Sequence, residues 1–345
     1  MRIPLSVHAF AAARTLRRKI SATSVILLYH RVIDLPSDPY RICVTPQHFA
    51  EHLQVVRRLG HPESLGDVSR RLRDGTLRRR SVVVTFDDGY ADCLENANPL
   101  LDRYDVPATL FVTSGYVGSD REFWWDELER VFLQPGTLPA TLALNLHGTV
   151  YEWELGAASQ YDLDEFSFHR HWNLSEPVDP GPRQGLFRSL YQTLHSLPEA
   201  ERRKAITFVR NWAGSPACRR PTHRILSSSE LADLANDRLI EIGDHTATHP
   251  DLTGLPLMEQ RSEIESSKTT LEEILGRPVV SFAYPHGARA KETVSIVREV
   301  GFDYACSTIH DVVWRRSDRF QLPRFRVLDW DGETFAERLS EWLDR

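Results

Sequence analysis

The stretch Val82-Val83-Val84-Thr85-Phe86-Asp87-Asp88-Gly89-Tyr90 decides the fold of this chain. An apolar, β-branched run that stops at Asp-Asp-Gly predicts a buried strand ending at the carboxyl edge of a sheet, where α/β folds build their sites. Two adjacent carboxylates there suit a division of labour in which one holds a cation and the other moves a proton. Because Asp-Gly after a strand is also a common turn, this run alone leaves both interpretations open.

A second short strand, predicted over residues 239–243, runs into Asp244-His245-Thr246-Ala247-Thr248-His249-Pro250. Two histidines four apart lie on one side of a helical turn or are brought together by a tight loop, and imidazole is a common zinc ligand. In a chain with 14 histidines such a pair is often only a surface feature. Its place at a strand end makes His245 and His249 candidates to complete a cation site with Asp88. One carboxylate and two imidazoles leave coordination positions open for water and substrate.

The remaining pattern alternates strands with helices. Thr45-Pro46 opens a helix with a cap residue and a proline in the first turn, and Gly60 ends it. Because strands that alternate with helices pair in parallel, the sheet should be parallel. The other predicted elements are strands over residues 82–86, 109–113 and 279–284 and helices over residues 259–275 and 292–300.

The two motifs resemble the polysaccharide deacetylase family, also called the NodB-homology domain or carbohydrate esterase family four. The family's Thr-Phe-Asp-Asp-Gly motif implies that Asp87 is the general base and Asp88 a metal ligand. Its His-Ser/Thr-x-x-His motif implies that His245 and His249 supply the two metal imidazoles. The implied fold is α/β, a distorted (β/α) barrel counted as seven-stranded, with a large inserted segment.

The resemblance also covers two segments outside these motifs. The first, Ile26-Leu27-Leu28-Tyr29-His30-Arg31, is similar to the opening strand of many bacterial members. The second is Leu322-Pro323-Arg324-Phe325-Arg326-Val327, near the end of the chain. The implied organisation is an N-terminal helical extension (1–23), a first barrel part (24–118), an insertion (119–221) and a second barrel part (222–345).

Two family motifs depart from the usual pattern. The third motif often reads Arg-x-Pro-x-Gly, with an arginine that pairs with the catalytic base, but this chain has Ala283-Tyr284-Pro285-His286-Gly287. We predict that Arg324 takes that role, the alternative being an ordinary structural or surface charge. A late Leu-x-His that supplies the general acid has no match after His310. Subgroups opening with a Tyr-His strand use that early histidine, which nominates His30 as general acid, against a core histidine satisfied by the backbone.

The resemblance further implies a substrate and oxyanion group. A backbone N–H at Tyr90, in the turn after Gly89, would stabilise the oxyanion together with the metal. Tyr284, Pro285 and Gly287 of the variant third motif are predicted to contact the substrate.

More than a hundred residues separate the strand ending at Thr113 from the strand starting at Leu239, far beyond a normal connection. We predict that residues 119–221 form an inserted, aromatic-rich subdomain beside the barrel mouth. Its tryptophans either stack on a sugar as a substrate cap or form the small core of the insertion itself. They are five of the eight tryptophans in the chain: Trp124, Trp125, Trp153, Trp172 and Trp212.

The amino-acid composition limits the classes of partner that the protein could bind. With 42 Lys and Arg against 48 Asp and Glu, the formal net charge is −6, which argues against nucleic acid. No window approaches the 18 apolar residues of a membrane span, so no transmembrane segment is expected. The cysteines Cys43, Cys93, Cys218 and Cys306 are predicted to be reduced core thiols.

The N-terminus imitates a signal peptide only faintly, because Pro, Ser and His break its apolar stretch. We expect it to remain uncleaved, as a packed helix or as a basic amphipathic helix resting on an anionic membrane surface. The location predicted is therefore cytoplasmic, with membrane association at the inner face as an alternative.

The residues, together with the resemblance, imply a metal-dependent N-deacetylase acting on an N-acetylated amino sugar in a polysaccharide, oligosaccharide or lipid-linked glycan precursor. The divalent metal expected is zinc. The alternatives are an amidohydrolase or esterase acting on a non-sugar substrate, and an inactive carbohydrate-binding relative.

Overall fold

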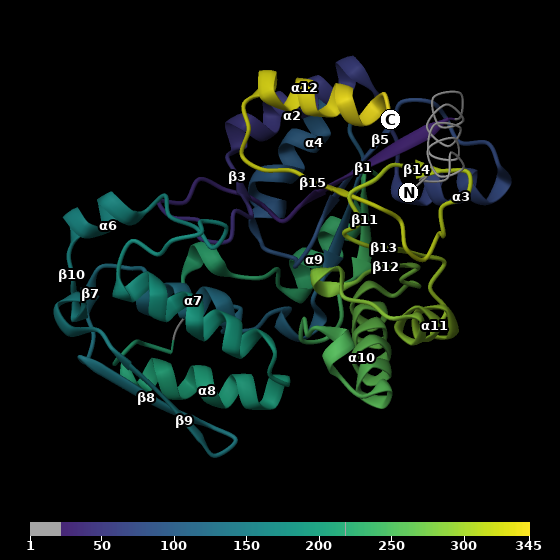
Figure 1. Cartoon of the computed structure of the whole chain (residues 1–345). Helices are drawn as coiled ribbons and strands as arrows, with labels where there is room; N and C mark the ends of the chain where they lie inside the picture. Colours follow the sequence, from purple (N-terminus) through teal and green to yellow (C-terminus); the bar gives the residue numbers. More distant parts are fainter. Residues whose placement is uncertain (1–21, 218) are drawn as a thin grey trace, which may run out of the picture.

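The computed structural model describes residues 22–217 and 219–345 (Figure 1). A barrel of parallel strands forms one part of the molecule, and residues 124–212 lie to one side of it (Figure 1). The predicted N-terminal helix and its membrane contact fall almost entirely outside the described residues, as does Cys218. Among the described residues, no helix is long and apolar enough to cross a membrane.

The central strands pair in parallel in the order β15-β1-β5-β6-β11-β12-β13, which confirms the predicted α/β barrel. Leu322, just before β15, bonds through its backbone to Ala305 and Ser307 of the β13 side and so closes the ring. One strand departs from the all-parallel prediction, because β14 (Val313–Trp314) pairs antiparallel with β1. The barrel strands are β1 (Thr23–Tyr29), β5 (Ser81–Phe86), β6 (Ala108–Val112), β11 (Ile240–Asp244), β12 (Ser281–Ala283), β13 (Tyr304–Cys306) and β15 (Phe325–Arg326). Three short strands flank them: β2 (Arg31–Val32), β3 (Cys43–Val44) and β4 (His61–Pro62).

Local sequence signals set the ends of the covering helices. The Thr45 side chain accepts a hydrogen bond from the His48 backbone and starts α2. Gly276, with φ of 63°, ends α10 in the left-handed conformation that glycine adopts without strain. The covering helices are α2 (Pro46–Leu59), α3 (Leu65–Asp74), α4 (Asn98–Tyr104), α9 (Ser228–Ala235), α10 (Leu257–Leu275), α11 (Lys291–Glu299) and α12 (Gly332–Leu343).

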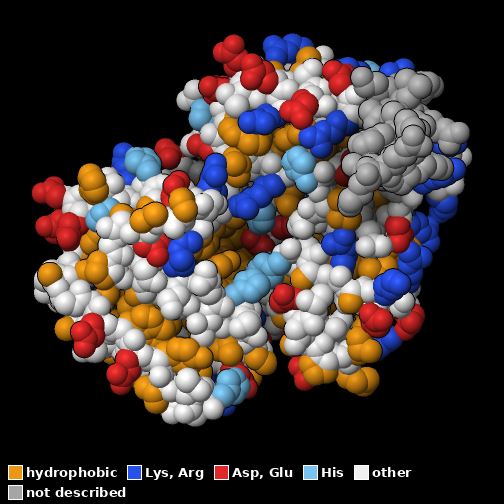
Figure 2. Space-filling view, viewed as in Figure 1, with side chains coloured by type: hydrophobic (Ala, Val, Ile, Leu, Met, Phe, Trp, Pro, Cys, Tyr) orange, Lys and Arg blue, Asp and Glu red, His pale blue; other side chains and the backbone are white. Residues whose placement is uncertain are grey.

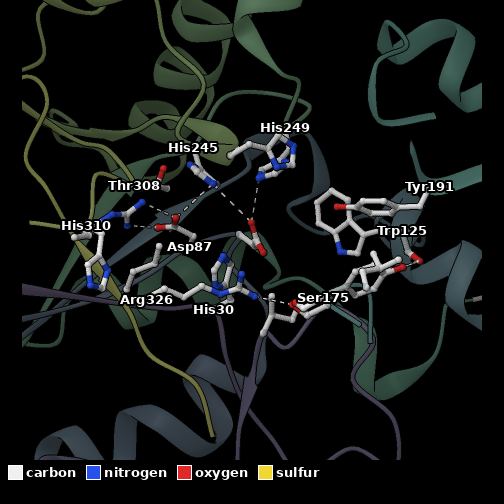
Figure 3. A pocket seen from close by; sticks show the side chains of 17 residues that line it. His30, Asp87, Trp125, Ser175, Tyr191, His245, His249, Thr308, His310 and Arg326 are labelled. Atoms are coloured by element: carbon white, nitrogen blue, oxygen red, sulfur yellow. Dashed lines mark hydrogen bonds and ion pairs between the residues drawn. The ribbon is translucent and has the colours of Figure 1, made fainter. Parts of the chain in front are cut away.

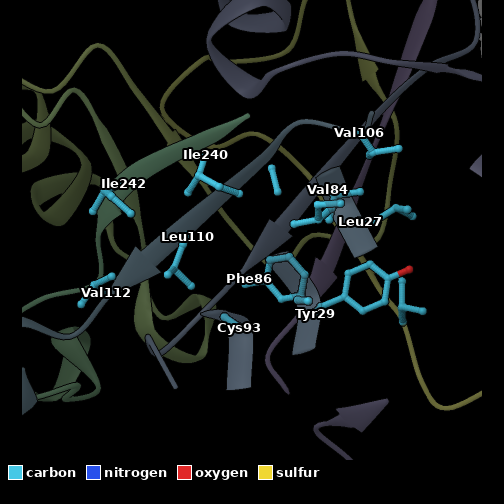
Figure 4. Packing of buried hydrophobic residues seen from close by; sticks show 14 of the residues in the cluster. Leu27, Tyr29, Val84, Phe86, Cys93, Val106, Leu110, Val112, Ile240 and Ile242 are labelled. Carbon is cyan, nitrogen blue, oxygen red and sulfur yellow. The ribbon is translucent and has the colours of Figure 1, made fainter. Parts of the chain in front are cut away.

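The barrel core is continuous with the inner surfaces of these helices. The strands β1, β5 and β6 are buried along their whole length, as expected for parallel strands covered on both faces. Figure 4 shows Leu27, Val84, Leu110 and Ile242 from four successive strands packed in one apolar cluster. Cys93 and Cys306 are buried free thiols as predicted, whereas Cys43 is only half-buried.

Residues 124–212 form most of a second apolar cluster, separate from that of the barrel. Trp124, Trp125 and Trp172 are buried in it, and Trp153 and Trp212 pack against it. These tryptophans therefore form the core of the insertion, which was one of the two expected roles. Trp125 in addition lines the cavity described below. The elements of this segment are α5 (Trp124–Phe132), β7 (Gly136–Thr137), β8 (Thr141–Leu146), β9 (Thr149–Glu154), β10 (Gln160–Tyr161), α6 (Leu163–His169), α7 (Pro182–His195) and α8 (Glu199–Trp212).

Candidate active site

A cavity of about 510 Å³ opens at the carboxyl ends of the barrel strands. The six predicted catalytic and metal residues all line it, although they come from segments far apart in the sequence (Figure 3). They are His30, Asp87, Asp88, His245, His249 and Arg324. In the space-filling view the hollow lies between the barrel and the insertion, with Lys, Arg and His side chains on its rim (Figure 2).

Asp87 follows β5 and is held by Arg324, the residue that precedes β15. Nη1 and Nη2 of Arg324 each donate to one carboxylate oxygen of Asp87 at 2.7 Å, and Nη1 also donates to Thr85 Oγ1 at 3.2 Å. Burial by itself would raise the pKa of Asp87, but the charges of Arg324 and His245 outweigh it and hold the pKa below its ordinary value. Asp87 is therefore ionised at neutral pH, as a general base must be.

Asp88 and Gly89 form the turn that the Asp-Gly pair predicted. Both have positive φ, 77° for Asp88 and 90° for Gly89. A Cβ atom at Gly89 would also lie 3.0 Å from Val112, so both the positive φ and the lack of space favour glycine at this position. The strained turn directs the Asp88 carboxylate into the cavity, beside Asp87.

A tight loop after β11, rather than a helical turn, brings the two histidines together. Thr246 and His249 both have positive φ, 67° and 59°. The loop is fixed from behind by Glu263 of α10, which accepts from the backbone N–H and the hydroxyl of Thr248. As a result Nε2 of His245 and of His249 lie 3.7 and 3.4 Å from Oδ1 of Asp88.

The donor set of Asp88, His245 and His249 fits a metal ion. One ligand atom from each lies within 4.8 Å of the others, and all three side chains are buried. Nδ1 of His245 bonds to the Ala283 carbonyl at 2.8 Å, which fixes the ring and leaves Nε2 for a metal. Oδ1 of Asp88 is buried without a hydrogen-bond partner, which is costly unless a cation satisfies it. Burial and the adjacent Asp87 raise the pKa of Asp88, and burial lowers the pKa of both histidines.

His30 follows β1 and lies next to Asp87 across the sheet, because Tyr29 pairs with Phe86. Figure 3 shows its ring in the cavity, near Asp87 and Arg326. Burial lowers the pKa of His30 to about 3, while the charge of Asp87 acts in the opposite direction. The imidazole is therefore neutral at pH 7. A role as proton donor requires it to receive a proton during the reaction.

The substrate contacts expected of the variant third motif stay a prediction, and the structure shows only where its residues lie. Tyr284, Pro285 and Gly287 do not line the cavity. The turn η6 (Pro285–Gly287) places His286 at a φ of 56° and directs it inward, while its neighbours are buried in the barrel. The hydroxyl of Tyr284 points away and donates to the Phe320 carbonyl at 3.0 Å.

Tyr90 is fully buried, and its side chain points toward the insertion. Its hydroxyl donates to Asp126 at 2.7 Å and accepts from Nε1 of Trp125 at 2.9 Å. These contacts fix the turn that carries the Tyr90 backbone. The oxyanion role of its N–H stays a prediction.

The structure adds residues to the cavity that the motifs did not indicate: Trp125, Tyr191, His286, Thr308, His310 and Arg326. His286 lies with its ring centre 4.6 Å from that of His249, nearly perpendicular to it. The pattern of alternate residues on β15 could have indicated Arg326, since Arg324 and Arg326 share one face of the strand. Tyr191 comes from α7 of the insertion and carried no sequence signal.

The fold and the site together define an α/β barrel protein with a carboxylate and imidazole donor set that fits a metal ion, beside a second, ionised carboxylate. A family model described as polysaccharide deacetylase matches residues 74–136 and 178–305, more than half of the chain. The chain belongs to the polysaccharide deacetylase family.

Two solved structures show the same fold. A Streptococcus pyogenes deacetylase, PplD, is 18% identical with a TM-score of 0.54, and the match covers 92% of this chain and 99% of that one. IcaB from Ammonifex degensii is 17% identical with a TM-score of 0.56, covering 94% and 98%. In sequence, a Staphylococcus aureus poly-beta-1,6-N-acetyl-D-glucosamine N-deacetylase is 42% identical over 48 residues, 14% of this chain. The match spans only 17% of the length of that relative.

Proposed function

We propose that this chain is a metal-dependent N-deacetylase that hydrolyses the acetamide of an N-acetylated amino sugar in a polysaccharide, oligosaccharide or lipid-linked glycan precursor. One arrangement carries the proposal: an ionised, arginine-held carboxylate beside a metal donor set in a cavity of about 510 Å³. The family, and the substrate in the printed name of the Staphylococcus aureus relative, support the same reaction class.

Asp88, His245 and His249 would hold the cation, for which zinc is our proposal because a mixed carboxylate and imidazole set suits it. When bound, a divalent cation supplies Lewis acidity toward a carbonyl and a lowered pKa for water. Asp87 accepts the proton of the attacking water, since Arg324 keeps its carboxylate ionised.

His30 then passes a proton to the departing amine. Because burial keeps the imidazole neutral, His30 must first receive a proton. Its source is the proton that Asp87 took from water, since Asp87 and His30 are neighbours across β1 and β5. Arg324 positions Asp87 through two parallel hydrogen bonds, and the Tyr90 backbone N–H is proposed to face the oxyanion.

An inactive carbohydrate-binding relative fits the site less well. Binding a sugar requires no ionised carboxylate beside a metal donor set. Burying the Asp87–Arg324 ion pair costs desolvation free energy, and sugar binding alone gives no reason for that cost. A lipid carrier for the substrate and a location at the inner membrane face stay predictions from the sequence, to be tested by cell fractionation.

The experiment measures acetate release from an N-acetylglucosamine oligomer by protein loaded with zinc. We expect release by the wild type and at least a hundredfold less by Asp87→Asn at equal metal content. Failure of the metal-loaded wild type to release acetate from any N-acetylated amino sugar would overturn the proposal. Activity on simple activated esters alone would favour the esterase alternative.

A further inference from the structure

Arg326 is the one strongly basic group in the cavity that is not matched by an acid. It follows Arg324 by two residues on the same strand end, and both side chains line the cavity. Figure 3 labels Arg326 there. Arg324 is neutralised by Asp87. In the part of the chain that the structure describes, no carboxylate lies within ion-pair distance of the Arg326 guanidinium. Among the carboxylates, Asp38 has the largest electrostatic effect on the Arg326 guanidinium.

Asp38 does not pair directly with Arg326. Its two oxygens accept backbone N–H groups from Ile42 at 3.1 Å and Cys43 at 2.8 Å. Arg326 itself donates through Nη2 alone, to the carbonyls of Tyr40 at 2.6 Å and Arg41 at 3.0 Å. An arginine has five N–H donors, so those on Nε and Nη1 remain without an acceptor among the described residues.

The register of the sheet places Arg326 relative to the predicted chemistry. Leu28 of β1 pairs with Arg326, and Leu28 and His30 lie on the same face two residues apart. A strand advances roughly 3.3 Å per residue, so Arg326 begins on the order of 7 Å nearer the mouth than Arg324. That separation suits a group on the same sugar or on its neighbour while the acetamide lies at Asp87.

With a divalent cation bound, the cavity would carry an excess of positive charge. Arg324 cancels the charge of Asp87, and a divalent cation more than cancels that of Asp88. The charge of Arg326 is then an excess at the mouth of the cavity, which His286 and His310 also line. A neutral acetylated sugar offers this guanidinium only uncharged acceptors. Hydrogen bonds to an ionised acceptor are about twice as strong.

We propose that Arg326 forms an anion subsite, so that the preferred substrate carries a phosphate or carboxylate group close to the acetylated nitrogen. This inference rests on the proposed function and narrows its substrate class. The anionic oxygens have two chemical sources: a phosphate that links the sugar to a carrier, or the carboxylate of an acidic sugar.

Three probes distinguish these sources: N-acetylglucosamine 1-phosphate, the neutral methyl glycoside of N-acetylglucosamine, and the methyl glycoside of N-acetylglucosaminuronic acid. We expect wild-type kcat/KM for one anionic probe to exceed that for the neutral probe by about ten- to a hundredfold, the range of one charge-assisted hydrogen bond. This ratio should fall as salt is raised. Preference for the phosphate probe assigns a sugar phosphate, and preference for the uronic probe assigns an acidic polymer.

In Arg326→Gln the ratio of anionic to neutral kcat/KM should approach one, and Arg326→Lys should keep part of it. Arg41→Gln is the matched control, because the Arg41 backbone carbonyl accepts a hydrogen bond from Arg326 while Arg41 itself lines a different cavity. It removes an equal charge and should leave the ratio unchanged. A wild-type ratio near one, or a preference that persists in Arg326→Gln, would overturn the subsite.

Binding of the same probes by calorimetry separates this inference from the proposed function. A binding preference that depends on Arg326 without acetate release would support the subsite and count against the deacetylase. Acetate release with no preference for the anionic probes would support the deacetylase and count against the subsite. If Arg326→Gln fails to fold, the salt dependence of the wild-type ratio and the Arg326→Lys variant decide the matter.

Discussion

Arg324 donates two hydrogen bonds of 2.7 Å to the carboxylate of Asp87, a residue 237 positions earlier in the chain. Both side chains are almost completely buried, with 0% and 5% of their surface exposed. The pair therefore joins the end of β5 to the start of β15 and sets the protonation state of the proposed base at the same time.

Removing Arg324 should change both stability and pH dependence. Breaking a buried ion pair leaves one charge uncompensated, so we expect Arg324→Met to lower the free energy of unfolding by about 3–5 kcal/mol. Without the charge of Arg324, burial should raise the pKa of Asp87. The acidic limb of the kcat/KM profile should then move to higher pH. The measurements are urea unfolding and a pH profile.

The pair between Arg298 and Asp318 is the matched control. It also has two hydrogen bonds, at 2.8 and 2.9 Å, but lies on the surface. Arg298→Met should cost less than about 1 kcal/mol and leave the pH profile unchanged. Equal losses in the two variants would contradict the structural importance assigned to the buried pair.

The adjacent aspartates should separate by metal content. Asp87→Asn should keep the cation and lose roughly a hundred- to ten-thousandfold in kcat, since an amide cannot accept the proton of water. Asp88→Asn should lose the cation first. Because the pKa of Asp87 lies below its ordinary value, the acidic limb of the wild-type pH profile should lie at lower pH than the titration of an ordinary aspartate. Metal analysis with a pH profile measures this, and a near wild-type rate in Asp87→Asn would remove Asp87 as base.

The histidine variants test the metal site through stability as well as activity. His245→Ala and His249→Ala should bind no zinc, and a chelator should lower the melting temperature of the wild type but not of these variants. His48→Ala is the control, because His48 pairs with Asp329 on the surface, away from the cavity. Full metal occupancy in both His245→Ala and His249→Ala would rule out the assigned ligands.

His30→Ala should lower turnover of an amide substrate by roughly a hundredfold or more while metal content stays constant. A substrate with a good leaving group should lose less. Since burial lowers the pKa of His30 to about 3, the imidazole does not titrate between pH 5 and 8, and the variant should keep the wild-type pH profile there. A limb that disappears in this range on mutation would show that His30 is charged in the working enzyme.

Two neighbouring tryptophans should behave differently. Trp125 lines the cavity and lies with its ring centre 5.0 Å from that of His249, so Trp125→Ala should weaken binding of long substrates more than of a monosaccharide. Trp124 is buried against Tyr191 and does not line the cavity, so Trp124→Ala should cost about 3–5 kcal/mol of stability instead. Thermal melts beside KM values for two substrate lengths distinguish them. The same length dependence in both variants would contradict the assignment.

Much of the barrel could be predicted from local patterns. The run before Asp87 and the cap at Thr45 are short-range signals, and the elements they predict appear within a residue or two of their expected bounds. The strand predicted over residues 279–284 is shorter, because only Ser281–Ala283 pair before the turn at Pro285 begins. Sequence could not set this end, since strand pairing depends on the neighbours β11 and β13.

The sequence by itself determined the chemistry that this protein can attempt. Asp87, Asp88, His245 and His249 stand at strand ends, and the carboxyl ends of parallel strands meet at one edge of a sheet. Only the tertiary structure decided what surrounds them. It brought Arg324 to Asp87, turned His286 inward and Tyr284 away, and left Arg326 without an acid. These outcomes depend on backbone turns and on contacts between distant segments, which no local period of apolar and polar residues encodes.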